Sequence, residues 1–241
     1  MKIVEAIWEK RNLGKYVLEV EIENSDHVDT VVDDLNGLTA DYIVLKVPCL
    51  LGEFIQPIQA LGFEFMEVLT HSIFDTDLPA LSRIEEKFLN NIRSEQISAS
   101  NGQLLDEAIA QGMFNTDRIS LDPKFMRGLS GDRYLGMLED ERARGATVYE
   151  ITYKEDFLGF YILRFVNETT SYSSIGGIIP KYQNKGLGIL MNYLQIRQSY
   201  ELGAKQVLST FSSNNVAATH IHWRYKYRLA RQETIFVKHG N

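Results

Sequence analysis

The sequence predicts an α/β (α+β) fold, and three observations support this prediction. Short β-branched and apolar runs, typical of strands, alternate with segments whose apolar residues recur at helical spacing. This alternation occurs in two separate stretches, before about residue 78 and after about residue 113. The chain has 241 residues and is 44% hydrophobic, which allows one large domain or two small ones.

Composition narrows the class of protein. The net charge is −7 and no basic face emerges, so we expect no nucleic-acid partner. No apolar run approaches about 18 residues, so no membrane partner is expected either. Cys49 is the one cysteine and lies in an apolar stretch, which predicts a buried, inert thiol. Glu5 and Glu9 interrupt any signal-peptide core, and a cytoplasmic location is the resulting expectation.

Residues 1–78 are expected to form a smaller α/β unit with the order β-α-β-α-β. Ser25 or Asp26 is expected to cap its first helix, and Gly62 to end its second. The expected strands and helices alternate as follows: strand 15–23, helix 28–35, strand 41–47, helix 52–61 and strand 63–70.

Residues 79–112 are charged and mostly helical in pattern, which predicts a connector. Residues 113–241 then form the second unit, whose order is helix, three strands, helix, strand, helix, strand. Ser213 and Asn214 are expected to cap its last helix. The expected elements are helix 132–144, strands 146–152, 157–165 and 169–179, helix 188–202, strand 206–212, helix 215–225 and strand 234–238.

The segment from Gln183 to Gly188, Gln-Asn-Lys-Gly-Leu-Gly, lies between a predicted strand and a predicted helix. Its two glycines let the backbone approach a ligand closely, and the helix N-terminus behind them offers unpaired N–H groups and a positive dipole end. These features favour a phosphate or pyrophosphate site. Neither the P-loop nor the dinucleotide fingerprint fits, because the lysine precedes the glycine and no third glycine follows. A simple strand-to-helix turn is the alternative.

The pattern Q-x-x-G-x-G after a strand ending in Ile178-Ile179-Pro180 resembles the acetyl-CoA pyrophosphate loop of the GNAT N-acetyltransferase superfamily. The resemblance implies a mixed, mostly antiparallel sheet flanked by helices, with two central strands splayed to admit the pantetheine arm. It implies acetyl-CoA as co-substrate and direct transfer to an amine, with N–H groups near Gly177 and Ile178 polarising the thioester carbonyl. The cofactor-binding residues that it implies are Gly177, Ile178, Gln183, Asn184, Lys185, Gly186, Leu187, Gly188 and Asn215.

The run Asn215 to His222 resembles the family pattern N-x-x-A-x-x-x-Y, with His222 in the tyrosine position. The resemblance implies that this residue protonates the departing CoA sulfur, which a histidine can do because its ordinary pKa lies near neutrality. Tyr225, one helical turn further on, is the second candidate catalytic residue. A packing role for His222 is the alternative. His220 and His222 lie on different helix faces, so no metal site is expected.

The segment Phe114 to Phe125 resembles acyltransferases that act on nucleotide-linked amino sugars, the dTDP-fucosamine type. Those enzymes also carry a partial GNAT-like domain before the catalytic one, and a closing aromatic-x-x-His segment like Phe236 to His239. Gln59 to Phe63 resembles the segment that ends many GNAT domains, so residues 1–78 are interpreted as a truncated GNAT half. This sequence departs from the pattern at His222, at Lys226 and at Gly176-Gly177.

The predicted function is transfer of an acetyl group from acetyl-CoA to a primary amine, an amino sugar on a nucleotide carrier being the favoured substrate. A protein N-terminus, a peptide or a polyamine is the alternative acceptor. A non-catalytic GNAT that binds acyl-CoA as a sensor is a hypothesis of another class. A small-molecule amine is therefore the expected partner, and a homodimer stays open.

Overall fold

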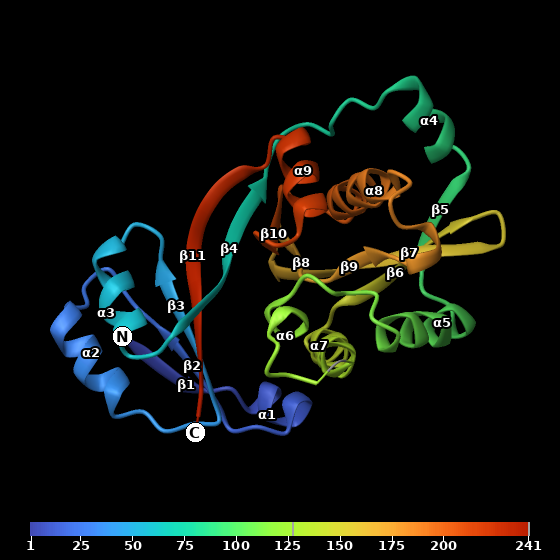
Figure 1. The fold of residues 1–241 in the computed structure, drawn as a ribbon. Coiled ribbons are helices and arrows are strands. Elements are labelled where there is room, and N and C mark those ends of the chain that lie inside the picture. The colour runs from blue at the N-terminus through green and yellow to red at the C-terminus, as the bar shows by residue number, and fades with distance from the viewer. Residues whose placement is uncertain (127, 241) are drawn as a thin grey trace.

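The computed structural model describes residues 1–126 and 128–240, whose elements are shown in Figure 1. Its strands are β1 (Lys2–Glu5), β2 (Val17–Glu21), β3 (Tyr42–Pro48), β4 (Glu64–Phe74), β5 (Ile92–Gln96), β6 (Thr147–Tyr153), β7 (Asp156–Asn167), β8 (Thr170–Ser173), β9 (Gly176–Ile178), β10 (Gln206–Ser212) and β11 (Arg228–His239). Its α-helices are α1 (Ile7–Leu13), α2 (Val28–Asn36), α3 (Ile55–Ala60), α4 (Arg83–Leu89), α5 (Ala99–Ala110), α6 (Arg118–Leu121), α7 (Leu129–Ala143), α8 (Leu187–Glu201) and α9 (Val216–Arg224). Short 3₁₀ turns cover Gly52–Phe54 and Pro180–Tyr182.

The strands form one mixed sheet in the order β1-β2-β3-β11-β4-β10-β8-β7-β6-β5, with β9 paired to β7 alone. Among the described strands, only the pairs β2–β3 and β8–β10 are parallel. The predicted mixed, mostly antiparallel α/β fold is therefore confirmed.

The last strand of the chain joins the two halves of the sheet. β11 lies between β3 and β4 and pairs with both in antiparallel register, so that Thr234 is opposite Val47 on one side and Val68 on the other. Figure 1 shows β11 and β4 side by side along the junction of the two halves. The division into segments 1–78, 79–112 and 113–241 stays a prediction about domains, but the sheet itself is continuous across both boundaries.

The expected internal repetition has a structural counterpart. A helix, a turn and a long strand recur as α3–β4 and as α9–β11, and the two strands are neighbours in the sheet. Gly62 has a φ of 84° in the first turn, and Lys226 has a φ of 56° in the second. Lys226 thus adopts the left-handed backbone conformation that the glycine of Leu-Gly-Phe adopts easily. In Lys226 this conformation is strained, because a residue with a side chain is disfavoured at positive φ.

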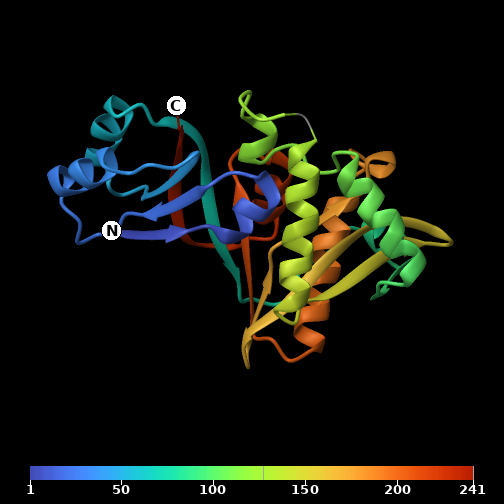
Figure 2. The same ribbon diagram turned by 90° about the horizontal axis from the view of Figure 1, so that it is seen from below.

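Helices cover both faces of the sheet around residues 147–212. α8 and α9 lie on one face, and α5, α6 and α7 lie on the other (Figures 1 and 2). β7 is buried on both sides and shows the two-residue period of a strand. Phe160 and Ile162 pack with Leu138 of α7, whereas Tyr161 and Leu163 pack with apolar residues of α8.

Several local predictions are wrong, and β5 is the largest error. The connector contains this strand, which pairs with β6 so that Ile92 is opposite Tyr153. The connector was expected to be mostly helical, whereas Arg93 and Glu95 lie exposed on an edge strand, where charge is favoured. The pattern also missed β1 and α1, and the expected loop at 98–102 is mostly the first turn of α5.

Two side chains near the start of the chain also differ from expectation. Neither Ser25 nor Asp26 caps α2, whose N-cap is His27, and the Asp26 carboxylate instead accepts a hydrogen bond from the Glu23 N–H at 2.7 Å. Cys49 is exposed, because β3 ends at Pro48 and the cysteine falls in the turn that follows. Within the described residues, none of the helices is both long and apolar enough to cross a membrane.

Candidate active site

The predicted strand 169–179 breaks into β8 and β9, and this break opens the sheet. β8 pairs with β10 as far as Ser173, which is opposite Ser209. Beyond that point β9 turns away to pair with β7, while β10 continues to Ser212 beside β4. The two central strands are therefore splayed, as the resemblance implied.

The splay leaves part of the β9 backbone unpaired. Ile179 N–H donates to Leu158 O at 2.9 Å, and Ile162 N–H donates to Ile175 O at 3.0 Å. Since hydrogen-bonded pairs alternate along an antiparallel ladder, the N–H of Gly177 faces β7 and that of Ile178 faces the opening. Of these two expected donors, Ile178 is therefore the one placed to meet a ligand.

Gly177 has a different role, because it makes room. A Cβ atom there would lie 2.9 Å from Met113 Cε and 3.0 Å from Phe114 Cε1, closer than ordinary van der Waals contact. The departure at Gly176-Gly177 therefore lets the segment before α6 approach β9 and form one wall of the opening.

The loop Gln183–Gly188 is fixed by its first side chain. Gln183 Nε2 donates to Ile178 O at 3.0 Å and to Met113 O at 3.3 Å, which ties the loop to β9. Asn184 and Gly186 both have a positive φ, of 61° and 77°, and Gly186 is the N-cap of α8. These turns leave the backbone N–H groups of residues 184–188 with no acceptor among the described residues. An anion would satisfy them at the positive end of a 15-residue helix.

This loop, β9 and the start of α9 enclose a cavity of ≈560 Å³. Gly188 stands at the point where α8 and α9 approach, since a Cβ atom there would lie 3.2 Å from Ile221 Cδ1. Lys185 does not line the cavity, and its amine donates to Lys181 O at 3.1 Å. The structure brings the other predicted cofactor-binding residues together around this cavity: Gly177, Ile178, Gln183, Asn184, Gly186, Leu187, Gly188 and Asn215.

The polar residues between β10 and α9 have roles that differ from those expected. Asn215, rather than Ser213 or Asn214, caps α9, because its Oδ1 accepts from Ala218 N–H at 3.0 Å. Ser213 Oγ instead accepts from Val68 N–H at 3.0 Å, and Asn214 donates to Met66 O. The cap of α9 is therefore also a residue of the cavity wall.

His222 points from α9 toward the splay. Its Nδ1 lies 2.8 Å from Ala218 O, so this nitrogen carries the proton, and Nε2 accepts a hydrogen bond from Ser209 Oγ at 3.0 Å. Burial lowers the pKa of His222 to about 4, so the ring is neutral at pH 7. Its ring also lies 4.3 Å from the rings of Phe211 and Tyr227.

Tyr225 is further from the opening than the helical spacing suggested. Its hydroxyl donates to Ile189 O at 2.9 Å, and its ring packs with Phe74 in the core beneath α8. Burial raises its pKa. Tyr225 lines neither cavity, whereas His222 lines the second one, described next.

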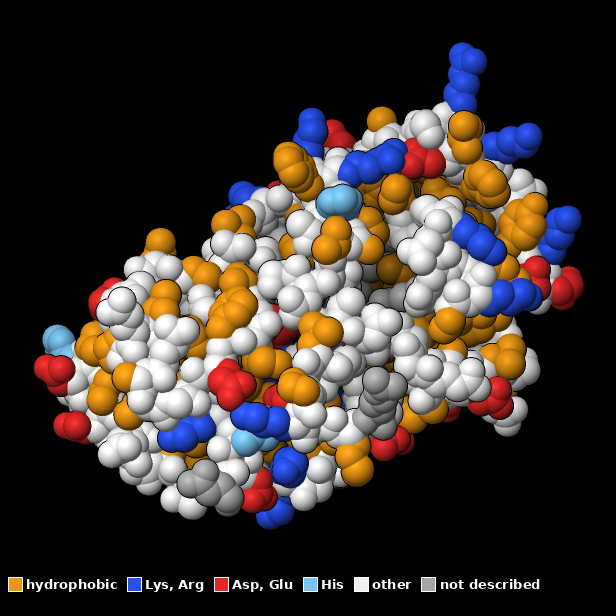
Figure 3. Space-filling view, in the orientation of Figure 1, with side chains coloured by type: hydrophobic (Ala, Val, Ile, Leu, Met, Phe, Trp, Pro, Cys, Tyr) orange, Lys and Arg blue, Asp and Glu red, His pale blue; other side chains and the backbone are white. Residues whose placement is uncertain are grey.

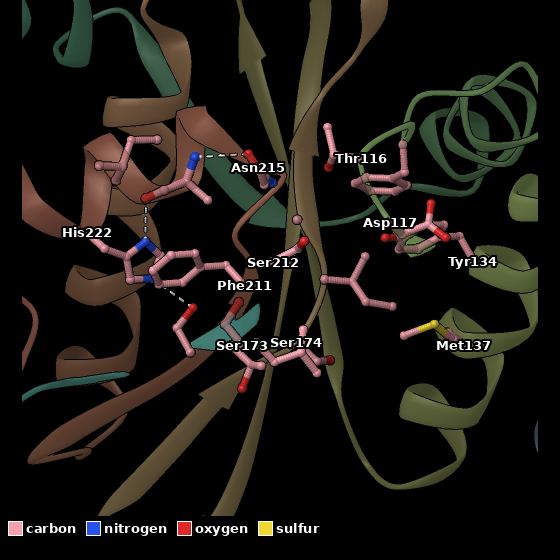
Figure 4. Close-up of a pocket in the computed structure, with 18 of the residues that line it drawn as sticks. Thr116, Asp117, Tyr134, Met137, Ser173, Ser174, Phe211, Ser212, Asn215 and His222 are labelled. Carbon is pink, nitrogen blue, oxygen red and sulfur yellow. Dashed lines mark hydrogen bonds between the residues drawn. The ribbon is translucent and has the colours of Figure 1, made fainter. Parts of the chain in front are cut away.

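A second cavity, of ≈280 Å³, adjoins the first and extends through the splay to the α7 side. In Figure 4, His222 and Asn215 lie on one side of the strands, and Asp117, Tyr134 and Met137 lie on the other. Figure 3 shows this face of the molecule hollowed between the two groups of helices, with mostly uncharged and hydrophobic surface at the mouth.

The charged lining of the second cavity is Glu67, Asp117, Arg118 and Arg133. Arg133 and Arg118 share the buried carboxylate of Glu9, at 2.7 and 2.9 Å, and Glu19 lies 3.7 Å from Arg118, so two carboxylates offset the two positive charges. Asp117 accepts from the hydroxyls of Ser120 and Ser130.

Glu67 differs from these charged neighbours. It is only 2% exposed and forms no hydrogen bond with a described residue; its nearest cation, Arg118, is 4.0 Å away. A buried carboxylate without hydrogen bonds is costly, and a ligand cation would offset that cost. Sequence reasoning missed Glu67 because it lies in the first half of the chain. The signal was present in the sequence as a charged residue between apolar positions of a strand.

The segment that resembled the amino-sugar acyltransferases has a structural explanation. Asp122 in that segment lies 2.7 Å from Nε2 of His239, which belongs to the closing aromatic-x-x-His segment. Phe125 packs on both Tyr42 and His239. The later residues of this segment and the closing motif therefore meet in space and anchor the end of β11, whereas its first residues, Phe114 to Arg118, line the cavities.

Comparisons with known proteins agree with this architecture. No family model and no curated protein matches the sequence. Among solved structures, the chain is similar to a GCN5-related N-acetyltransferase from Sphaerobacter thermophilus, with a TM-score of 0.58 and 11% identity over 82% of this chain and 59% of that one. It is also similar to a functionally unknown conserved protein from Staphylococcus epidermidis, with a TM-score of 0.61 and 11% identity over 94% of this chain and 84% of that one.

A tandem GNAT protein from the clavulanic acid biosynthesis pathway has a TM-score of 0.50 and 11% identity, over 83% of this chain and 64% of that one. The chain thus spans less than two thirds of the length of this protein and of the Sphaerobacter enzyme. These likenesses show that the chain has the GNAT fold.

Proposed function

We propose that this protein is an acyl-CoA-dependent N-acetyltransferase that moves an acetyl group from acetyl-CoA to a small-molecule primary amine. The observation that carries the proposal is the run of unpaired N–H groups at residues 184–188, at the N-terminus of α8 and beside the splay. Such a run suits the pyrophosphate of coenzyme A, because it supplies donors and a positive dipole end together.

The splay offers a route for the rest of the cofactor. The pantetheine arm would follow β9, whose Ile178 N–H faces the opening, and would bring the thioester to the junction of the two cavities. The same N–H is our candidate for stabilising the negative charge that develops on the thioester oxygen. Asn215 lines both cavities and is the candidate for orienting the arm near the thioester.

The amine would enter through the second cavity. Glu67 is the candidate for attracting its ammonium form, because it is the lining carboxylate without a hydrogen bond. After loss of a proton, the amine nitrogen attacks the thioester carbonyl, the C–N bond forms, and the C–S bond breaks to release the thiolate of coenzyme A. Binding both reactants on opposite sides of one opening lowers the entropic barrier to this attack.

The proton for the departing sulfur has two routes. Of the two candidate acids from the sequence, His222 is the one that lines the second cavity. Its Nε2 would first have to gain a proton, which the lowered pKa of about 4 disfavours at pH 7. Water is the other route, since a thiolate is a stable enough leaving group to be released before it is protonated.

The substrate class is a finer proposal. A nucleotide-linked amino sugar would need cations for its phosphates, and the two arginines of the cavity are already paired with two carboxylates, those of Glu9 and Glu19. As the acceptor substrate, we therefore favour a small amine whose remaining part is uncharged, or a polyamine, over the nucleotide-linked amino sugar. A peptide or protein N-terminus is a further acceptor to test.

The non-catalytic alternative rests on one observation, the neutral and buried His222. Two measurements separate it from an enzyme. Calorimetry with coenzyme A tests the cofactor site, and release of free thiol from acetyl-CoA with a panel of amines tests transfer. The panel holds an amino sugar, its nucleotide-linked form, a polyamine and a short peptide. Binding without thiol release for any amine would support the sensor hypothesis.

A further inference from the structure

A carboxylate, an imidazole and a hydroxyl form a chain that ends in the second cavity. Glu233 on β11 lies with Oε2 2.8 Å from His71 Nε2, and His71 Nδ1 lies 3.1 Å from Thr210 Oγ1. His71 on β4 is directly opposite Thr210 on β10 in the antiparallel ladder, and Thr210 lines the cavity. Thr210 is also the first residue of β10 beyond the last pairing with β8.

The direction of the hydrogen bonds follows from the chemistry of the groups. The hydrogen bond to His71 lowers the pKa of Glu233, so this group is a carboxylate and can only accept. His71 Nε2 therefore carries the proton that is donated to Glu233, and Nδ1 is left to accept from the Thr210 hydroxyl. Thr210 also forms a side-chain hydrogen bond with Tyr172, so one lone pair of Thr210 Oγ1 remains available to a donor in the cavity.

We propose that Glu233, His71 and Thr210 form a relay that removes the proton of the acceptor amine. An ammonium N–H in the cavity would give its proton to Thr210 Oγ1 while the Thr210 proton moves to His71 Nδ1. The product is a neutral amine with a free lone pair, an intact Thr210 hydroxyl and an imidazolium held beside Glu233. No further reactant is needed, and this proposal rests on the proposed acetyltransferase function.

The surroundings of His71 suit a group that takes a proton and passes it on. Its side chain is 24% exposed, so an imidazolium can return its proton to solvent after transfer. The charged and titratable groups that face the relay are Glu233, Arg231 and Lys46, from β11 and β3, and Tyr172 of β8 on the Thr210 side. Glu67 lines the same cavity and would hold the ammonium, whereas Thr210 would receive its proton.

The test is the pH dependence of kcat/KM for the best amine of the panel, measured for Thr210→Val, Thr210→Ser and His71→Gln. Thr210→Val removes the hydroxyl with little change in shape, and we expect a loss of roughly 10²-fold near neutral pH, the usual scale for general base catalysis. That loss should shrink at high pH, where the amine is already neutral. Thr210→Ser should retain the wild-type profile, and His71→Gln should resemble Thr210→Val.

The control is Thr70→Val, which makes the same change next to His71 at an exposed hydroxyl that binds Gln232. This control and all relay variants should bind coenzyme A as the wild type does. A wild type that transfers acetyl groups while Thr210→Val keeps its pH profile overturns the relay alone. A wild type that binds coenzyme A but transfers to no amine overturns the proposed function and the relay together.

Discussion

Nε2 of His222 accepts a hydrogen bond from Ser209 Oγ at 3.0 Å, and Ser209 is the last residue of β10 that pairs with β8. The histidine of α9 is therefore attached to the point where the two strands begin to separate. This contact gives His222 a positioning role at the splay, whatever its part in proton transfer.

The two routes for protonating the sulfur predict different effects of His222→Phe. An acid that acts in the transition state would lower kcat by roughly 10²-fold or more and leave the KM for acetyl-CoA nearly unchanged. Because the pKa of about 4 keeps the ring neutral at pH 7, we expect a loss of less than about tenfold, with Tyr225→Phe milder still. Steady-state kinetics of both variants decides the matter, and a loss of 10²-fold for His222→Phe would restore the acid role.

The lowered pKa of His222 also predicts how the stability of the protein depends on pH. Its folded pKa of about 4 lies below the unfolded value of 6.5, so between these values the unfolded chain binds a proton that the folded chain does not. The free energy of unfolding should therefore fall as pH decreases from 6.5, by about 3 kcal/mol at pH 4 from this residue. Urea unfolding at several pH values should show a steeper decline for the wild type than for His222→Phe.

The matched control for this pH dependence is His27→Gln. His27 is exposed at the N-cap of α2, so this variant removes an imidazole without changing a buried site. Equal slopes for the wild type and His222→Phe would mean that His222 is not buried in the neutral form.

Gly186→Val tests the anion site. The valine would add a side chain at the turn that presents the unpaired N–H groups and would strain a backbone with a φ of 77° by about 1–2 kcal/mol. We expect no measurable coenzyme A binding by calorimetry. Gly203→Val carries a comparable strain, with a φ of 98° at the other end of α8, and should bind normally. If the two folded variants bind coenzyme A with equal affinity, the loop Gln183–Gly188 is not the anion site.

Glu67→Gln tests the amine site. It removes the negative charge but keeps the shape, and a hydrogen bond to a charged group contributes about 1.5–3 kcal/mol. We therefore expect the KM for the amine to rise by roughly tenfold to a hundredfold, with coenzyme A affinity unchanged. Glu64→Gln on the same strand breaks only an exposed pair with Lys124 and should behave as the wild type. An unchanged KM in Glu67→Gln would place the ammonium elsewhere.

The geometry of the proposed cofactor side could be predicted from the sequence because its determinants are local. The loop Gln183–Gly188, the strand before it and the helix after it are consecutive, so spacing alone indicates how they meet. The acceptor side could not be predicted in this way. Glu67 and His71 reach it through the pairing of β4 with β10, which joins residues more than a hundred positions apart.

The fold shows the same distinction. Strong local patterns predicted α7, α8 and the hairpin of β6 and β7, whereas the place of β11 depends on two partners that no local pattern identifies. The splay of the two central strands was expected only from the resemblance, and the break between β8 and β9 was not predicted, because a continuous strand 169–179 satisfies the residue pattern equally well.

The insertion of β11 between β3 and β4 has a consequence for how the chain is made. During synthesis, the strands of the first 78 residues emerge long before residues 228–239, so the edges of β3 and β4 stay unpaired with β11 until those residues emerge. A ribosome-bound fragment ending before β11 would therefore be exposed to edge-to-edge association, and its completion closes both edges in one step. β11, which is translated after the other described strands, is thus the one that joins the two halves of the sheet.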